Sequence, residues 1–479
     1  MELHVVIEGD KDLTGQLYRQ LKEAIRSGRL AAGEKLPPSR LLAERLSLSR
    51  KTVNEAYARL TYESLVEGKV GSGTFVSSSV PARKPLGLAD FAGSAVVERW
   101  RSMPTPLRHP APAGTARYEY IGGAPSRALF PLDDWRRSVM HALRVAATSR
   151  GIYGETEGLP ALRDLIARHV AFSRGVRCTL EDVIVTTGAQ QALDLVARVL
   201  VEPGCTVAFE EPGYPPARQL LAAQGANVVG IPVDAEGMQV EHIPDGTRLI
   251  YVTPAHQFPL GMPMSARRRK ALLARARALG AVVIEDDYDG EFRYEGRPTD
   301  SLQSMDTRGN VAFVGTFSKT LSPELRLGYL VAPPALLQAV GTAKHLTDWH
   351  TSMPAQWALA KFMENGELLK HIRRCHTVYA ERREKIMARF NGDLSPWFEL
   401  IPATAGIHLA ALCRREIDMD MLLRLARRAE VGLYGLDVFY HFAPARQGLM
   451  LGYGVIDTAD IAPSLDRVRD ILQQMDPLT

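Results

Sequence analysis

The chain has 479 residues, of which 46% are hydrophobic and 23% charged, and its formal net charge is +4 at pH 7. That length suffices for about three domains, and the mildly basic balance permits a nucleic-acid partner without requiring one. The four cysteines lie far apart, which argues against a disulfide framework, and no run of about 18 apolar residues suggests a membrane span. We therefore expect a cytoplasmic protein with reduced thiols.

Residues 1–78 have the pattern of three short helices followed by a hairpin. Apolar residues recur at every fourth position from Leu13 to Ile25, which predicts a first helix ending near Gly28. Ser39 is the expected cap of a second helix, and Ser49 the expected cap of a third. Two short strands around a glycine turn follow within residues 65–76. This order of elements predicts an α+β winged helix-turn-helix.

The third predicted helix begins with the polar and basic residues Arg50, Lys51 and Thr52. In a winged helix, this end would enter the major groove of DNA, and its N-terminal amides would favour phosphate. The alternative is a small helical docking module whose basic turn is merely solvated. Spacing, capping and the hairpin together favour DNA binding.

The stretches 36–40, 48–53 and 71–76 resemble the GntR family of bacterial repressors. The resemblance covers about residues 11–78 and implies double-stranded operator DNA as a partner. It also implies a hairpin turn that reaches the minor groove. The residues predicted to bind DNA are Arg40, Ser49, Arg50, Lys51, Thr52, Lys69, Gly71 and Gly73.

Residues 79–115 are rich in proline and lack a sustained period, which predicts a linker. From about residue 116 onward, apolar strands alternate with amphipathic helices, as in a mostly parallel sheet covered on both faces. The strand at 183–187 runs into a helix at Gly188, where Ala189 and Gln190 could present backbone amides to a phosphate. An ordinary strand-to-helix turn is the alternative. Tyr214, fixed between glycine and proline, could stack on an aromatic ring.

Asp286 follows the apolar strand 281–285, at the end of the strand where open α/β sheets bind their ligands. An aspartate there can keep a pyridine nitrogen protonated. Tyr288 is placed to bond the phenolic oxygen of the same ring. Metal binding is the alternative for this acidic segment, but no histidine accompanies it in the sequence, and we expect no metal.

Lys319 ends the segment Gly-Thr-Phe-Ser-Lys, directly after the apolar strand 311–314. Burial favours the neutral amine, which is a nucleophile toward aldehydes. The hydroxyls of Thr316 and Ser318, with Arg326 seven residues on, suit a phosphate dianion. Together these features predict pyridoxal phosphate (PLP) held as a Schiff base on Lys319. An ordinary surface lysine is the alternative.

Residues 118–475 resemble fold-type I PLP-dependent aminotransferases, and with the N-terminal region the whole chain resembles MocR/GabR-type regulators. The resemblance implies an α/β domain over residues 116–479, with a large part at about 116–334 and a small C-terminal part at about 335–479. The run Tyr251–Gly261, with Phe258 in place of the usual asparagine, supports the narrower placement. The resemblance also implies a homodimer in which Tyr153 reaches the phosphate of the neighbouring subunit.

One position departs from the aminotransferase pattern. The arginine that usually holds the substrate carboxylate would stand near Met450 in this chain. Arg446 and Arg127 are the candidate substitutes for binding an effector. The effector therefore either lacks an α-carboxylate or is held in another way.

These features predict a PLP-dependent, DNA-binding transcription regulator that senses an amino compound, or PLP itself, through Lys319. The alternative is a catalytically active aminotransferase with an accessory N-terminal domain. We expect no net turnover and at most a residual transamination half-reaction.

Overall fold

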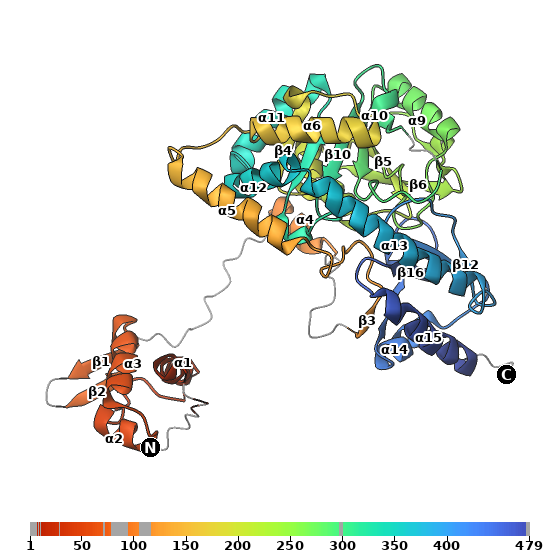
Figure 1. Ribbon diagram of the computed structural model, residues 1–479. Coiled ribbons are helices and arrows are strands. Elements are labelled where there is room, and N and C mark those ends of the chain that lie inside the picture. The colour runs from red at the N-terminus through yellow and green to blue at the C-terminus, as the bar shows by residue number, and fades with distance from the viewer. Residues whose placement is uncertain are drawn as a thin grey trace. The chain divides into compact units, whose positions relative to one another are not determined.

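The computed structural model describes residues 7, 9, 11–27, 29–69, 72–77, 94–104, 116–296 and 300–475. The chain divides into two compact units, residues 1–98 and 99–479 (Figure 1). Of the predicted linker, residues 79–93 and 105–115 lie outside the described residues. Residues 95–102 form a helix, α4 (Ala95–Ser102), which the linker prediction did not contain. Within the described residues, no helix is long and apolar enough to cross a membrane.

The first unit contains the predicted three helices and antiparallel hairpin. Its buried core joins all of these elements and includes Leu17, Val53, Leu60 and Val76. The Ser39 cap prediction was wrong, because Pro38 occupies the cap position and Ser39 is the first helical residue. The elements are α1 (Leu13–Arg26), α2 (Ser39–Arg45), α3 (Arg50–Tyr62), β1 (Val66–Lys69) and β2 (Gly73–Val76).

The second unit is built on an eight-stranded sheet of order β4-β11-β10-β9-β8-β5-β6-β7. The central pairs from β10 to β6 are parallel, whereas β11 runs antiparallel to both of its neighbours and β7 is antiparallel at the edge. The strands are β4 (Val183–Thr186), β5 (Thr206–Glu211), β6 (Asn227–Asp234), β7 (Gly237–Met238), β8 (Thr247–Val252), β9 (Val282–Asp287), β10 (Val311–Thr316) and β11 (Gly328–Val331).

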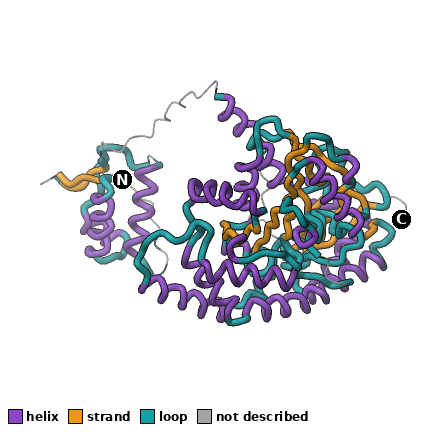
Figure 2. The backbone as a smooth tube through the Cα atoms, turned by 90° about the horizontal axis from the view of Figure 1, so that it is seen from above, coloured by secondary structure: helices purple, strands orange, loops and turns teal. Residues whose placement is uncertain are grey.

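Helices cover both faces of this sheet, and in the tube view they surround its strands (Figure 2). Along β9, Ile284 packs in one core cluster and Val283 in another, as expected for a strand buried on both faces. The helices are α5 (Leu132–Thr148), α6 (Pro160–Arg174), α7 (Ala189–Leu200), α8 (Pro215–Ala223), α9 (Ala266–Leu279), α10 (Leu302–Met305), α11 (Pro334–Asp348) and α12 (Met353–Glu364).

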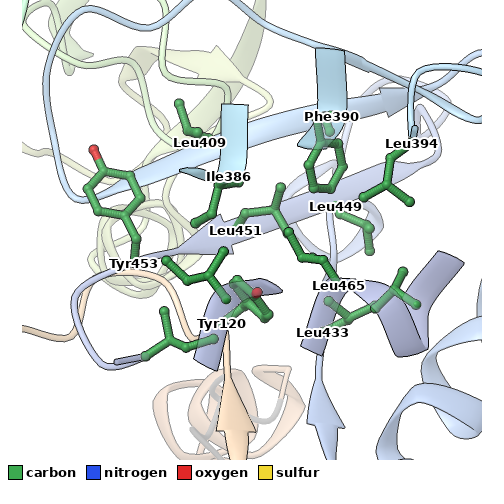
Figure 3. Packing of buried hydrophobic residues seen from close by; sticks show 14 of the residues in the cluster. Tyr120, Ile386, Phe390, Leu394, Leu409, Leu433, Leu449, Leu451, Tyr453 and Leu465 are labelled. Atoms are coloured by element: carbon green, nitrogen blue, oxygen red, sulfur yellow. The ribbon is translucent and has the colours of Figure 1, made fainter. Parts of the chain in front are cut away.

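A smaller four-stranded antiparallel sheet of order β12-β13-β16-β15 follows the long helix α13. Its core includes Ile386, Phe390, Leu409 and Leu451, which point toward one another in Figure 3. The elements of this part are α13 (Glu367–Asn391), β12 (Phe398–Leu400), β13 (His408–Cys413), α14 (Met419–Arg428), β14 (Val431–Gly432), β15 (Tyr434–Gly435), β16 (Gly448–Gly452) and α15 (Ile461–Met475).

The predicted boundary near residue 334 between the large and small parts differs from the structure. Val340 of α11 and Phe362 of α12 pack in the cores of the large sheet, and α13 carries the chain from those cores into the small one. Strand β3 (Tyr118–Glu119) pairs with β14, so the start of the predicted large part belongs to the small one. Both differences arise from contacts between residues far apart in sequence.

Leu451 offers a test of the small core. Leu451→Ala should lower the free energy of unfolding of this part by about 2–5 kcal/mol, because the fully buried side chain leaves a cavity. Leu369→Ala, at an exposed position of α13, should change it by less than about 0.5 kcal/mol. Urea denaturation followed by tryptophan fluorescence measures both. Equal losses in the two variants would contradict this packing.

Candidate functional site

The predicted cofactor residues come from neighbouring strands that end at one edge of the large sheet. Val314 of β10 lies beside Asp286 of β9, and Gly328 of β11 lies between Thr186 and Thr316. The segments that follow β4, β9 and β10 therefore start side by side. This is the edge at which α/β sheets bind their ligands.

Lys319 is partly buried, and its Nζ donates a hydrogen bond of 2.6 Å to the carbonyl oxygen of Gly123. Burial lowers the pKa of the Lys319 amine, while the charges of Asp289 and Asp286 act in the opposite direction. The amine is thus a stronger nucleophile at neutral pH than a solvated lysine.

Asp286 is buried and has an unmet capacity to accept a hydrogen bond. Its Oδ2 accepts from the Tyr251 hydroxyl at 2.7 Å, whereas its Oδ1 has no partner among the residues that the structure describes. Burial raises the pKa of Asp286 to about 6. A buried, unpartnered carboxylate oxygen at this edge suits the N–H of a pyridinium ring, which is the partner that the PLP prediction requires.

Tyr214 and Tyr288 lie beside this aspartate. Burial raises the pKa of both phenols, and the negative charge of Asp286 raises it further. The pKa of Tyr214 reaches about 12. The Tyr288 hydroxyl donates to the carbonyl oxygen of His256 at 2.9 Å. A cofactor oxygen would have to share or replace that bond, so the predicted role of Tyr288 stays a prediction.

The predicted phosphate site gathers at the start of α7. Gly188 precedes the helix with a φ of 79°, and a Cβ atom placed there would lie 3.0 Å from Nη2 of Arg326. The same Nη2 donates to the carbonyl oxygen of Thr187 at 3.2 Å. A Cβ atom on Gly328 would lie 3.0 Å from the Ala189 nitrogen. Gly188 therefore lets the guanidinium, and Gly328 lets strand β11, approach the start of α7 closely.

Thr316 and Ser318 stand at the end of β10. The Thr316 hydroxyl accepts from the Ser318 amide at 3.1 Å and lies 3.0 Å from the Ser318 hydroxyl. Both side chains are buried, whereas Gln190, in the first turn of α7, is half-buried. Hydroxyls, helix amides and a guanidinium are the donors that a phosphate needs, so this set fits PLP.

Tyr153, predicted to serve the neighbouring subunit, lies on the surface of this chain. Its side chain is 70% exposed, and its ring centroid lies 4.1 Å from that of Trp349. Ile152 and Leu346 are also exposed. The loop between α5 and α6, which carries Tyr153, contacts α11 through Thr156, whose Oγ1 lies 3.1 Å from Nδ1 of His345.

The effector candidates Arg127 and Arg446 are both exposed. The charge of Arg446 acts on Tyr440, where it partly offsets the rise in the tyrosine pKa that burial causes. Met450, by contrast, is buried in an apolar cluster. The structure therefore places neither arginine in the position that Met450 fills.

A buried cluster of His256, Asp289 and His408 was missed by the sequence analysis. The Nδ1 of His256 lies 3.0 Å from the Asp289 carboxylate, and His408 Nε2 lies 3.1 Å from the carbonyl oxygen of Pro259. Burial is the main cause that lowers the pKa of His408 to about 3. The sequence argument that no histidine accompanies the acidic segment was wrong, because His256 lies beside Asp289. The ligand atoms of the three residues are close enough together to hold a metal ion. No sequence spacing signals residues this far apart.

Glu211 also went unnoticed in the sequence. Its Oε1 accepts hydrogen bonds from three consecutive backbone amides, those of His441, Phe442 and Ala443, at 2.6, 2.9 and 3.2 Å. Gly213 donates to the carbonyl oxygen of Phe439 at 3.3 Å. The loop that carries Tyr214 is thus tied to residues 439–443 of the small part.

In the first unit, the basic side chains Arg40, Arg50 and Lys51 are exposed in the first turns of α2 and α3. Ser49 caps α3 as predicted, accepting from the Thr52 amide at 3.0 Å, and the two hydroxyls lie 2.8 Å apart. The cap fixes the helix end that carries the predicted DNA contacts.

The hairpin presents Lys69 and Gly73 on its exposed side. The Lys69 ammonium lies 5.2 Å from the centre of the Phe75 ring and 3.5 Å from the Glu67 carboxylate. Gly73 has a φ of 114°, which only glycine adopts readily. The predicted wing residue Gly71 lies outside the described residues.

The raised pKa of Asp286 predicts how cofactor-free protein depends on pH. The folded state binds this proton more tightly than the unfolded state does, so stability falls as pH rises from about 4 to about 6. Asp286→Asn removes that loss and should stabilise the cofactor-free protein at pH 8 by up to about 3 kcal/mol. The gain should shrink as pH approaches 4.

Thermal unfolding between pH 4 and pH 8 measures this difference. Asp245→Asn, at an exposed carboxylate, is the control and should show no comparable gain. If Asp286→Asn were less stable than wild type at pH 8, burial of the charged Asp286 carboxylate would not be destabilising the folded protein.

Comparisons with known proteins agree with this geometry. Residues 123–440 match the family model "Aminotransferase class I and II", and residues 13–76 match "Bacterial regulatory proteins, gntR family". The α-aminoadipate aminotransferase of Thermus thermophilus, solved with N-(5'-phosphopyridoxyl)-L-leucine, is 28% identical with a TM-score of 0.69. The match covers 76% of this chain and 94% of that one.

Two curated relatives match nearly the whole chain. The "Probable rhizopine catabolism regulatory protein MocR" of Rhizobium meliloti is 36% identical over 97% of this chain and 95% of its own length. The "HTH-type pyridoxine biosynthesis transcriptional regulator PdxR" of Corynebacterium glutamicum is 31% identical over 95% of each. The chain therefore belongs to the MocR-type transcriptional regulators, in which a GntR-family winged helix is joined to an aminotransferase-like domain that takes pyridoxal phosphate.

Proposed function

We propose that this regulator senses a small amine by exchanging it for Lys319 on the cofactor, and that the exchange changes its affinity for operator DNA. The observation that carries the proposal is the pairing, at one sheet edge, of a lysine with a lowered pKa and a buried aspartate with an unpartnered oxygen. Because the same chain carries a winged helix, a reaction at Lys319 can alter DNA binding.

Pyridoxal phosphate, when bound, supplies an aldehyde that condenses with primary amines. Asp286 would accept the ring N–H at its Oδ1, and Tyr214 would lie against the ring. Arg326, Ser318 and the amides at the start of α7 would hold the phosphate. Lys319 supplies the resident amine, whose neutral form burial favours.

Release of Lys319 would free an amine that can gain a proton beside Asp286 and Asp289. Such a change of charge in a desolvated site can shift a two-state arrangement of the protein. We propose that the protein acts as a homodimer, with Tyr153 completing the phosphate site of the neighbouring subunit. The exposed Ile152, Tyr153, Leu346 and Trp349 support an interface there.

A working aminotransferase is the second candidate function. It is favoured by the same residues, since Asp286 and Tyr288 stand at the end of β9 and Lys319 follows the end of β10. Multiple turnovers with an amino donor and a keto acid, together with no retention of DNA, would favour the enzyme. A third reading, in which free PLP is itself the signal, predicts a DNA response to PLP without any added amine.

Lys319→Ala tests the covalent step. Wild-type protein incubated with PLP should gain a visible absorbance band and an amine-dependent change in DNA binding, and the variant should lose both, because it has no amine to offer. Lys270→Ala, at an exposed lysine of α9, should behave as wild type. Full ligand-dependent regulation in Lys319→Ala would rule out a covalent mechanism.

Arg50→Ala tests the DNA-binding surface. With a duplex selected from a random pool by the wild-type protein, the variant should bind more weakly by about 1–3 kcal/mol, because a cation is lost at the recognition helix. Arg59→Ala is the matched control, since Arg59 lies in the last turn of α3 and pairs with Glu55 at 2.9 Å. Fluorescence anisotropy at several salt concentrations measures the DNA affinity of both variants. Equal losses of affinity would argue against DNA binding by the first turn of α3.

A further inference from the structure

We infer that the effector is a primary amine without a carboxylate, and that Met450 and Phe258 set this preference by offering it an apolar wall. The inference rests on the proposed exchange at Lys319 and specifies its ligand. It follows from what surrounds the Lys319 amine, since an incoming amine must place its nitrogen where that amine now lies.

The turn of Gly122 and Gly123 lies between Lys319 and Met450. A Cβ atom on Gly123 would lie 3.1 Å from Nζ of Lys319, and one on Gly122 would lie 2.5 Å from Cε of Met450. A backbone without side chains therefore separates the amine from the methionine. The group attached to an incoming amine would pass along this turn and meet the Met450 thioether.

Met450 belongs to an apolar cluster that extends to the predicted ring site. The cluster contains Leu260, Met262 and Phe439, with Phe258 packed against it. The Phe258 ring lies 5.0 Å from Phe439, 5.4 Å from Tyr214 and 5.9 Å from Tyr288, in each case edge to face. One aromatic side chain thus contacts both the cofactor residues and the apolar cluster.

The charged groups around the amine offer an effector carboxylate no cation of its own. Among the charged groups that act on Lys319, Asp286 and Asp289 are acidic, and the basic one is Arg326. Arg326 donates to Thr187 and lies against Gly188, at the phosphate end of the site. With Asp286 engaged by the ring N–H and Asp289 beside His256, a carboxylate on the effector would meet the apolar wall without a cation, and burying an unpaired carboxylate is costly.

The exchange itself needs no further reactant. The incoming nitrogen would form the C=N bond that the Lys319 nitrogen would give up, and Lys319 would leave as a free amine. One amine replaces another, so the oxidation state does not change and no proton is consumed overall. The substituent on the amine therefore determines which amine replaces Lys319 most readily.

A matched pair of compounds tests the inference. 2-Phenylethylamine and L-phenylalanine differ only by the carboxylate. With full-length, PLP-loaded protein, the amine should shift the visible band and the melting temperature at a concentration about tenfold or more below that of the amino acid. Equal or better performance of the amino acid would overturn the inference while leaving the exchange at Lys319 intact.

Variants at Met450 locate the preference. Met450→Arg supplies a cation and should raise the response to phenylalanine above that to phenylethylamine, whereas Met450→Leu should keep the wild-type order. Met421→Arg, at an exposed position of α14, is the matched control and should also keep it. An unchanged order in Met450→Arg would overturn the role of Met450.

If Met450→Arg fails to bind the cofactor, the comparison of 2-phenylethylamine with L-phenylalanine on the wild-type protein is the test of the inference. A wild-type band that neither compound moves would overturn the inference about the effector. Absence of any visible band in PLP-treated wild type, or a band of full intensity in Lys319→Ala, would instead refute the proposed function. The two failures are therefore distinguishable.

Discussion

Three consecutive buried acids at the end of β9 are the constraint around which the site is organised. Glu285 accepts from the backbone amides of Leu302 and Gln303 at 2.8 and 2.9 Å, and Asp287 is paired with Arg174 at 2.6 Å. Asp286, between them, bonds only the neutral hydroxyl of Tyr251 among the described residues. Asp286 and Asp287 each keep one oxygen without a partner among the described residues, but Asp287 has a cation beside it and Asp286 has none in hydrogen-bond contact, so Asp286 is the acid whose charge a ligand N–H can compensate.

Much of the site was predictable because its signals are local. Lys319 and Asp286 each follow an apolar run, and strand ends in a parallel sheet gather at one edge whatever the loops between them do. Ser49 was likewise readable, since a helix cap depends on residues three positions apart. For the same reason, the winged helix could be recognised from the spacing of its apolar residues.

Other features depend on contacts that no spacing reveals. His256 and Asp289 follow different strands of the large sheet, and His408 begins a strand of the small sheet, so no spacing in the sequence indicates that the three meet. The boundary between the two parts fell inside α13 because a single helix packs in both cores. Sequence reasoning found that Met450 departs from the expected pattern, but only the fold shows that it lies across a glycine turn from Lys319.

The contact of Glu211 with residues 441–443 has a consequence for dynamics. Three neighbouring amides share one carboxylate oxygen, and the described structure gives these amides no helix or sheet partner. Their protection from hydrogen exchange therefore depends on a single event, the departure of Glu211, and they should exchange together. Because Glu211 also ends the strand that leads to Tyr214, these amides are a natural reporter of how firmly the ring site is closed.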